Sequence, residues 1–299
     1  GKVIFQVRGK VPRHSMKARE VRIPAALVDA VVVDATQRQG YDLVYDAALS
    51  GQDRRDDPEP PQPAFSSRLV IARRAQQELH DNAVINFGFG IPDQIAKLID
   101  RDGHAERYFQ TIEHGTYGGR LMDGDLFGYA MNPSCMIDGP SQFDFYSGGG
   151  LDIAFLGFGE IDAAGNVNVS KLGGNTVGPG GFIDIAQNAR KVVFCGTFDT
   201  GGARLETGDG TLRVTSHGRI PKLVEKVDQI TFSGPQASVQ GQHVIYVTER
   251  AVFELREDGV HLVEIAPGID LQADVLDRMG FTPRMESPLS EMNSGLFKE

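Results

Sequence analysis

Short apolar runs alternate with helix-like stretches from about residue 67 onward, and this alternation most constrains the fold. Strands are predicted at 83–87, 109–112, 153–156, 192–194, 229–232, 244–247 and 251–255. Helices are predicted over about 67–80 and 93–99. Continuous apolar strands separated by helices are typical of a parallel sheet buried on both faces. The sequence therefore predicts an α/β protein with an open, mainly parallel sheet and helices on both faces.

The chain divides into three segments in this interpretation. Residues 1–35 hold a β-branched run at 3–7 and a second apolar run at 23–33, and they look like the last elements of a sheet. Because two strands are not stable alone, we expect another polypeptide to supply the rest of that domain. Residues 36–67 are charged and proline-rich and are predicted to be a linker. Residues 68–299 form the main domain, with a polar, peripheral tail after Met285.

The composition argues against several classes of partner and site. The 299 residues carry 30 Lys and Arg against 40 Asp and Glu, so the net charge is −10, which disfavours a nucleic-acid or anionic-membrane surface. No apolar run approaches the roughly 20 residues of a membrane span. Cys135 and Cys195 form no metal-ligand spacing and fit a reducing cytoplasm. P-loop, GxSxG, HExxH and CxxC motifs are absent, which favours metal-independent chemistry.

A glycine loop, Gly88-Phe89-Gly90, lies between a predicted strand and a predicted helix. Such a loop at a helix N-terminus can direct backbone N–H groups toward a phosphate, a carboxylate or a developing oxyanion. The alternative is a tight turn in which Pro92 starts the helix. The spacing alone leaves both interpretations open.

Glu113 directly follows the predicted strand 109–112, and glycines follow at once. Ligands of open parallel sheets collect beyond the carboxyl ends of the strands. A carboxylate in this place is ionised at neutral pH and can act as a nucleophile toward an activated acyl group. The alternative is a carboxylate that caps loop N–H groups. His114 is expected to face the opposite way and to be a packing or loop residue.

Two further glycine clusters lie at 148–150 and 173–181. The second is so rich in Gly, Asn, Thr and Pro that it is predicted to be neither helix nor strand. We expect a mobile loop or a loop that lies close to a ligand.

Together these segments resemble the family I CoA-transferases, specifically the acetate/propionate CoA-transferase type. The matching segments are Asn86–Pro92, Glu113-X-Gly115 with Gly118-Gly119, Gln142–Asp152, Gly165–Lys171, Gly178–Ile185, Thr248–Phe253 and Val263–Gly268. The resemblance covers most of the chain, and it identifies residues 1–35 as the end of the family's first half. It implies that a second chain supplies the rest of that half and that the protein is a cytoplasmic oligomer.

The resemblance also implies a reaction and a set of site residues. Glu113 would carry CoA as a glutamyl-CoA thioester during transfer between a short-chain acyl-CoA and a carboxylate acceptor. Gly88, Phe89 and Gly90 would form the oxyanion and thioester loop, Asn86 would lie near the pantetheine arm, and Gly180 and Gly181 would line the CoA pocket. CoA is then a substrate, and neither a permanently bound cofactor nor a metal is expected. Two alternatives stay open: an acyl-CoA hydrolase on the same scaffold, and a non-catalytic CoA-binding subunit of a split enzyme.

Overall fold

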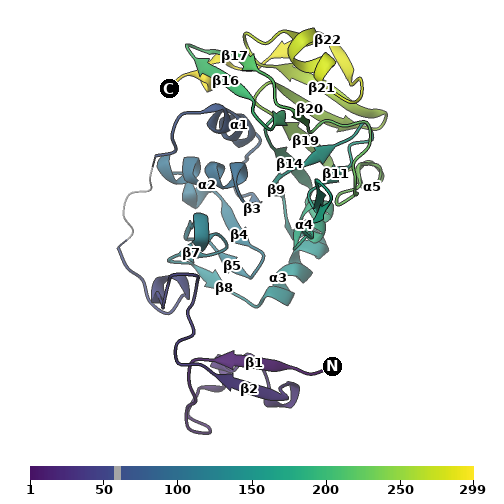
Figure 1. The fold of residues 1–299 in the computed structure, drawn as a ribbon. Coiled ribbons are helices and arrows are strands. Elements are labelled where there is room, and N and C mark those ends of the chain that lie inside the picture. The colour runs from purple at the N-terminus through teal and green to yellow at the C-terminus, as the bar shows by residue number, and fades with distance from the viewer. Residues whose placement is uncertain (57–61) are drawn as a thin grey trace.

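The computed structural model describes residues 1–56 and 62–299. A ten-stranded sheet with the order β22-β21-β20-β19-β14-β9-β3-β4-β5-β8 forms the centre of the main domain (Figure 1). Its parallel core consists of β19 (His243–Val247), β14 (Lys191–Cys195), β9 (Ile153–Gly157), β3 (Val84–Phe87) and β4 (Phe109–Ile112). The flanking strands are β20 (Ala251–Arg256), β21 (Gly259–Ile265), β22 (Arg284–Glu291), β5 (Thr116–Tyr117) and β8 (Cys135–Met136). The predicted α/β class with a mainly parallel sheet is therefore confirmed, with antiparallel strands added on both sides of the parallel core.

Helices cover both faces of the sheet because the inner strands are apolar on both sides. One core cluster contains helices α1 (Ser67–Gln76) and α2 (Ile91–Arg101), and the other contains residues of α4 (Phe182–Asn188) and α5 (Gly234–Gln240). In β9, Phe155 belongs to the first cluster, whereas its neighbours Ala154 and Leu156 belong to the second. This alternation follows from the two-residue period of a strand. A short helix, α3 (Gly139–Phe145), leads into the π-helical turn Tyr146–Gly150 just before β9.

Local sequence signals determine where the helices begin. The Ser66 hydroxyl accepts a hydrogen bond from the Leu69 N–H at the start of α1. At α2, the Asp93 carboxylate accepts from the Gly90 N–H, and Pro92 occupies the first turn. All the named helices lead into a strand of the parallel core, so their N-termini lie at the edge of the sheet where the strands end (Figure 1).

Three predictions about the main domain were wrong: the strand at 229–232, the cluster without strands at 173–181, and the peripheral tail after Met285. The run 229–232 is no strand: Phe232 is buried and makes only a single bridge to Val167, while the side chain of Ile230 is exposed. The cluster 173–181 begins as a small hairpin of β12 (Lys171–Leu172) and β13 (Asn175–Thr176), because Gly173 and Gly174 accept the positive φ angles of its turn.

The tail after Met285 is not peripheral. β22 pairs in parallel with β21 at the edge of the sheet, and Phe297 is fully buried in the core cluster that contains α1. A second hairpin, β16 (Arg204–Gly208) and β17 (Thr211–Ser216), also packs near α1 and was not predicted. These segments are polar on average, but a few apolar residues anchor each of them.

The predicted linker is only partly free of the main domain. Ala48 and Leu49 are buried against Met131, and the side chain of Asn132 both donates to and accepts from the backbone of Arg55. The segment that leads up to Arg55 therefore docks on the main domain. Residues 57–61, which contain most of the proline-rich part of the linker, lie outside the described residues.

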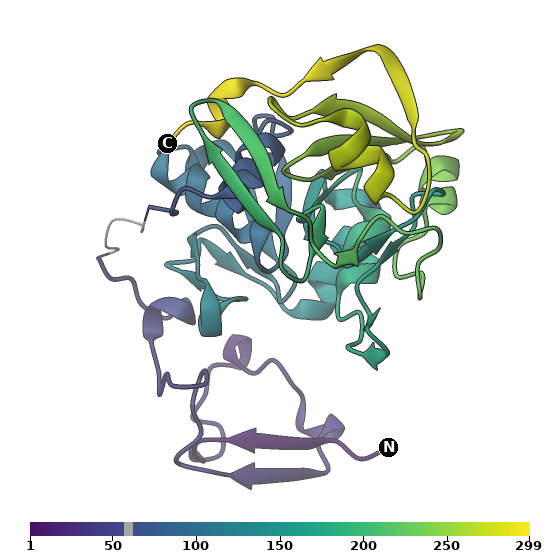
Figure 2. The ribbon, with the colours of Figure 1, turned by 45° about the horizontal axis from the view of Figure 1, so that its top comes forward.

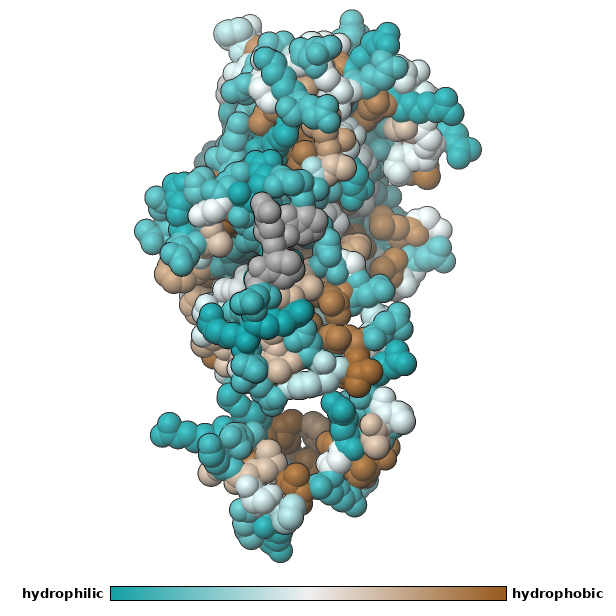
Figure 3. All heavy atoms as spheres, turned by 90° about the vertical axis from the view of Figure 1, so that its left-hand side faces the viewer, coloured by the Kyte–Doolittle hydropathy of each residue, from teal (hydrophilic) through white to brown (hydrophobic). Residues whose placement is uncertain are grey.

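The N-terminal segment forms a separate parallel pair of β1 (Ile4–Val7) and β2 (Ala30–Val33) (Figures 1 and 2). Apolar side chains of this pair lie open to solvent: Ile4 is 65% exposed and Val31 is 50% exposed. Hydrophobic residues are correspondingly visible on the surface of this segment in Figure 3. Such a pair buries too little apolar surface to be stable by itself. Across the described part of the chain, no helix combines the length and the apolar character that crossing a membrane requires.

Candidate functional site

The centre of the candidate site is a contact between Asn86 and Glu113. Asn86 is buried in β3, and Glu113 is the first residue after the adjacent strand β4, with a half-buried side chain. Asn86 Nδ2 donates to Glu113 Oε2 over 3.2 Å. Among the described residues, no Lys, Arg or His forms an ion pair with Glu113. The carboxylate therefore lies at the carboxyl edge of the sheet without a neutralising cation.

Two hydroxyl groups lie beneath this contact. Tyr146, which is fully buried, has its hydroxyl 3.4 Å from Asn86 Nδ2 and 2.6 Å from Thr111 Oγ1. The Thr111 hydroxyl in turn donates to the Ile85 carbonyl over 2.8 Å. Burial, with a smaller contribution from the charge of Glu113, raises the pKa of Tyr146 to about 12. The phenol is therefore neutral at physiological pH.

The Gly88–Gly90 loop directly follows β3, but most of its N–H groups are already used. The Gly88 N–H donates to the Phe155 carbonyl over 2.7 Å, and the Gly90 N–H donates to Asp93 over 3.1 Å. The Phe89 N–H donates to no group among the described residues. Gly90 has φ +97°, a conformation that favours glycine. Of the three predicted donors, only that of Phe89 is left for a ligand.

Gly180 and Gly181 lie at the N-terminus of α4. Gly181 is connected to the Glu113 site only through the side chains of Phe143 and Tyr146. A Cβ on Gly181 would come within 3.0 Å of the Phe143 ring, whereas a Cβ on Gly180 would meet open space. The Phe143 ring lies edge-on to Tyr146, with 6.3 Å between the ring centroids. Close approach to Phe143 thus explains the small residue at 181. The predicted role of these glycines in CoA binding stays a prediction.

The turn after Glu113 depends on glycine. Gly115 has φ +101°, and a Cβ there would collide with the Ile137 carbonyl. His114 lies against the opposite loop, where its Nδ1 is 3.3 Å from the Gly128 carbonyl oxygen. This tight turn directs Glu113 toward Asn86 and His114 away from it.

The buried charges of the Thr248–Phe253 segment are used inside the protein. Arg250 is fully buried, pairs with Asp199 at 2.8 Å and lies 4.7 Å from the centroid of the Phe198 ring. Glu249 accepts from the Phe198 N–H over 2.9 Å. These residues join the ends of β14 and β19 and present no charge to solvent.

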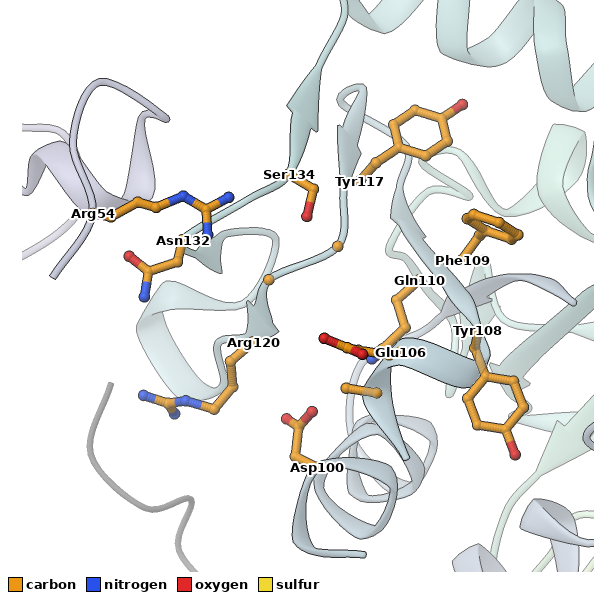
Figure 4. Close-up of a pocket in the computed structure, with 13 residues that line it drawn as sticks. Arg54, Asp100, Glu106, Tyr108, Phe109, Gln110, Tyr117, Arg120, Asn132 and Ser134 are labelled. Atoms are coloured by element: carbon orange, nitrogen blue, oxygen red, sulfur yellow. The ribbon is translucent and has the colours of Figure 1, made fainter. Parts of the chain in front are cut away.

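A cavity of about 620 Å³ lies elsewhere, beside the start of β4 and the end of α2. Figure 4 shows Asp100, Glu106 and Gln110 turned toward the same space, with Arg54 and Asn132 on its opposite side. None of the residues predicted for the site lines this cavity.

Sequence reasoning missed Thr111 and Tyr146 as members of the site. Tyr146 lies within the Gln142–Asp152 segment that carried the family resemblance, so that segment was the available signal. Nothing in the local sequence indicates that its hydroxyl meets Thr111, because the contact spans 35 residues.

Comparison with known proteins gave several strong similarities, although no family model matched the chain. Acetate CoA-transferase YdiF of Escherichia coli O157:H7 is 44% identical over 298 residues, which are 99% of this chain and 56% of the relative. Caffeate CoA-transferase of Acetobacterium woodii is 43% identical over 307 residues, covering 100% of this chain and 58% of the relative. The chain thus spans little more than half the length of these curated relatives.

A solved structure agrees with these matches. The crystal structure of the acyl-CoA transferase YdiF from E. coli O157:H7, as a thioester complex with CoA, superposes with a TM-score of 0.89 and 42% identity. The match covers 99% of this chain and 56% of the YdiF chain.

Proposed function

We propose that this chain, which belongs to the family I CoA-transferases, contributes the nucleophilic glutamate of an acyl-CoA transferase, and that this residue is Glu113. The observation that carries the proposal is the Asn86–Glu113 contact at the carboxyl ends of two adjacent parallel strands. A half-buried carboxylate that forms no ion pair with any residue of 1–56 or 62–299 keeps its lone pairs available for attack. Glu113 also lies in the Glu113-X-Gly115 segment, which is one of the segments that resemble the family.

The proposed reaction passes through two covalent intermediates. A Glu113 oxygen attacks the thioester carbonyl, the carbon–sulfur bond breaks, and CoA leaves as a thiolate. The thiolate then attacks the glutamyl carbonyl of the resulting anhydride, which releases the first carboxylate and leaves a glutamyl-CoA thioester. An acceptor carboxylate reverses both steps and leaves as the new acyl-CoA. A carboxylate nucleophile suits this exchange because an anhydride, unlike an ester, keeps the acyl group activated.

The surrounding residues support these steps by position and charge. The Asn86 amide orients one oxygen of Glu113 and leaves the other free to attack. The Phe89 N–H lies in the loop at the N-terminus of α2, where a donor and the helix dipole would favour a developing oxyanion. The proposal keeps Gly88, Phe89 and Gly90 as the oxyanion and thioester loop, with the Phe89 N–H as its available donor. It also keeps Asn86 near the pantetheine arm and adds its contact with Glu113.

We propose that residues 1–35 belong to the family's first half and that 68–299 form the catalytic domain. The exposed apolar side chains of β1 and β2 require other elements to cover them. YdiF and caffeate CoA-transferase carry the matched segment inside one longer chain, so they give no support to the expected second polypeptide. We therefore propose that the first half completes this site without assigning it to a separate subunit.

We propose a small carboxylate and its CoA thioester as substrates, with CoA entering as a substrate rather than a resident cofactor. The names of the relatives include acetate and caffeate, so the acyl group differs among proteins of this similarity. A cytoplasmic oligomer remains part of the proposal.

The proposal is tested by trapping the covalent intermediate. The complete protein is incubated with acetyl-CoA, treated with borohydride and digested, and the peptide that contains residue 113 is analysed by mass spectrometry. Reduction at Glu113, lost in Glu113→Gln and kept in the exposed control Glu106→Gln, is the expected result. A modified residue elsewhere, or none in an active sample, would refute the mechanism. Release of CoA without an acceptor carboxylate would instead indicate hydrolysis.

A further inference from the structure

Because the Thr111 hydroxyl donates to the Ile85 carbonyl, the hydrogen bonds beneath Glu113 run in one direction. The Ile85 carbonyl can only accept, so the single hydroxyl proton of Thr111 is used in the 2.8 Å bond to it. The 2.6 Å contact between Thr111 and Tyr146 therefore takes its proton from Tyr146. The lone pairs of the Tyr146 oxygen are then left to accept from Asn86 Nδ2.

This direction fixes the side-chain amide of Asn86. An amide can rotate by half a turn and exchange its oxygen and nitrogen. With Oδ1 in place of Nδ2, Asn86 would set an acceptor against both the Tyr146 oxygen and the Glu113 carboxylate, and both contacts would be repulsive. Because Asn86 is 1% exposed, no bulk water can compensate for the lost bonds.

We infer that Tyr146 and Thr111 are positioning residues for the nucleophile, acting on Glu113 through the amide of Asn86. This inference rests on the proposed role of Glu113. Neither hydroxyl touches a reacting atom. Their effect is to hold the donor face of Asn86 toward Glu113 Oε2 while the other carboxylate oxygen attacks.

The network explains why a tyrosine is needed at a site that a phenylalanine could fill by volume. Tyr146 is fully buried in the second core cluster, where Phe143 and Phe145 contact its ring. A phenol in such surroundings needs a partner for its proton, and Thr111 supplies it. Asn86 Nδ2 supplies the N–H donor for a lone pair of the Tyr146 oxygen.

The test compares Tyr146→Phe with Tyr246→Phe in the complete protein. Tyr246 is also fully buried in the same cluster, and its hydroxyl donates to the Gly165 carbonyl. Neither residue takes part in the hydrogen bonds that join Thr111, Tyr146, Asn86 and Glu113. We expect Tyr146→Phe to lower kcat about tenfold with the KM for acyl-CoA changed less than twofold. Tyr246→Phe should retain the kcat of the unaltered protein, even if its thermal stability falls.

The threonine provides a rescue and a coupling test. Thr111→Val should match the loss in Tyr146→Phe, and Thr111→Ser should restore kcat to within about threefold, because serine keeps the hydroxyl. The double variant Tyr146→Phe/Thr111→Val should be no slower than either single variant, since the two residues act as one chain. The inference would be overturned if the loss of kcat in the double variant equalled the product of the two single losses. A normal kcat in Tyr146→Phe would also overturn it.

A single-turnover measurement separates this inference from the proposed function. The rate at which Glu113 becomes a thioester is followed by mass spectrometry in the unaltered protein and in Tyr146→Phe. A thioester that forms at the same rate in both would refute the positioning role alone. Absence of any thioester in the active, unaltered protein would refute the proposed function.

Discussion

The Asn86 amide donates to Glu113 Oε2 across 3.2 Å, and the two residues lie at the ends of adjacent parallel strands. Strands of a parallel pair end at the same edge, so this contact follows from the register between β3 and β4, in which Asn86 pairs with Thr111. The carboxylate is therefore held by the rigid core of the sheet rather than by a surface loop.

Asn86→Ala removes this donor and should lower kcat. A hydrogen bond to a charged group contributes about 1.5–3 kcal/mol, which corresponds to a loss of roughly tenfold to a hundredfold in rate. The measurement is the steady-state exchange of CoA between acetyl-CoA and a second carboxylate. Asn82→Ala, an exposed asparagine before β3, is the matched control and should keep its activity.

Asn86→Asp should change the pH profile rather than only the rate. A second carboxylate about 3 Å from Glu113 raises the pKa of one member of the pair, because two like charges repel at that distance. The nucleophile would then be protonated at low pH, and activity should recover as the pH rises. A profile parallel to that of the unaltered protein would contradict this expectation.

Much of the fold could be predicted because the inner strands are apolar along their whole length. The predicted run 109–112 agrees with β4, and β3, β9 and β14 differ from their predictions by one residue at one or both ends. Segments anchored by only a few apolar residues escaped prediction. Phe297 is the example: it lies in a polar tail, yet it is fully buried next to α1.

The site was predictable only as separate pieces. Glycines and a carboxylate after strands indicated where Gly88–Gly90 and Glu113 would lie, since strand ends meet at one edge of the sheet. The bond from the Gly90 N–H to Asp93 is a local helix cap that the sequence analysis missed. The partner of the Gly88 N–H could not be predicted, because Phe155 belongs to another strand. Pairwise contacts of this kind depend on three-dimensional register.

Gly181→Val should impair turnover through its neighbours. A Cβ at this position would approach the Phe143 ring to 3.0 Å, and Phe143 contacts the Tyr146 ring. We expect kcat/KM for acyl-CoA to fall by about tenfold, since overpacking of 1–3 kcal/mol would be transmitted toward the nucleophile. Gly208→Val is the control, because a Cβ at Gly208 meets open space at the end of β16. Equal kinetics in the two variants would contradict the expectation.

Arg250→Met should destabilise the main domain strongly. The guanidinium is fully buried and pairs with Asp199 and Glu249, so its removal takes away the cation with which both buried carboxylates pair. Breaking a buried pair in this way costs about 3–5 kcal/mol of unfolding free energy. Urea denaturation of the complete protein measures the change.

Arg213→Met serves as the control for that experiment. Arg213 also pairs with a carboxylate, Glu206, but both side chains are more than half exposed on the hairpin β16–β17. An exposed pair contributes at most about 1 kcal/mol. Similar losses in Arg250→Met and Arg213→Met would show that burial does not determine the value of these pairs.

Lys222 should make the stability of the protein depend on pH in the alkaline range. Its ammonium group lies 4.1 Å from the centroid of the Phe158 ring, and burial lowers its pKa from 10.5 to about 8, a shift that the nearby charge of Glu249 opposes. Between pH 8 and 10.5 the unfolded chain holds a proton on this lysine that the folded chain has lost. Unfolding therefore takes up a proton, and the free energy of unfolding rises with pH in this window.

The comparison of Lys222→Met with the unaltered protein isolates this effect. Below pH 8, Lys222 is protonated in both the folded and the unfolded chain, so the folded state bears the full cost of burying its charge. In this range Lys222→Met should have its largest gain in stability over the unaltered protein. As the pH rises from 8 toward 10, the unaltered protein should recover by up to about 1.4 kcal/mol per pH unit relative to Lys222→Met. Lys226→Met, at an exposed position on the same segment, should show no such trend. The difference in free energy of unfolding between Lys222→Met and the unaltered protein could instead stay constant from pH 7 to 10. In that case burial does not lower the pKa of Lys222, and its contact with Phe158 must leave the ammonium group solvated.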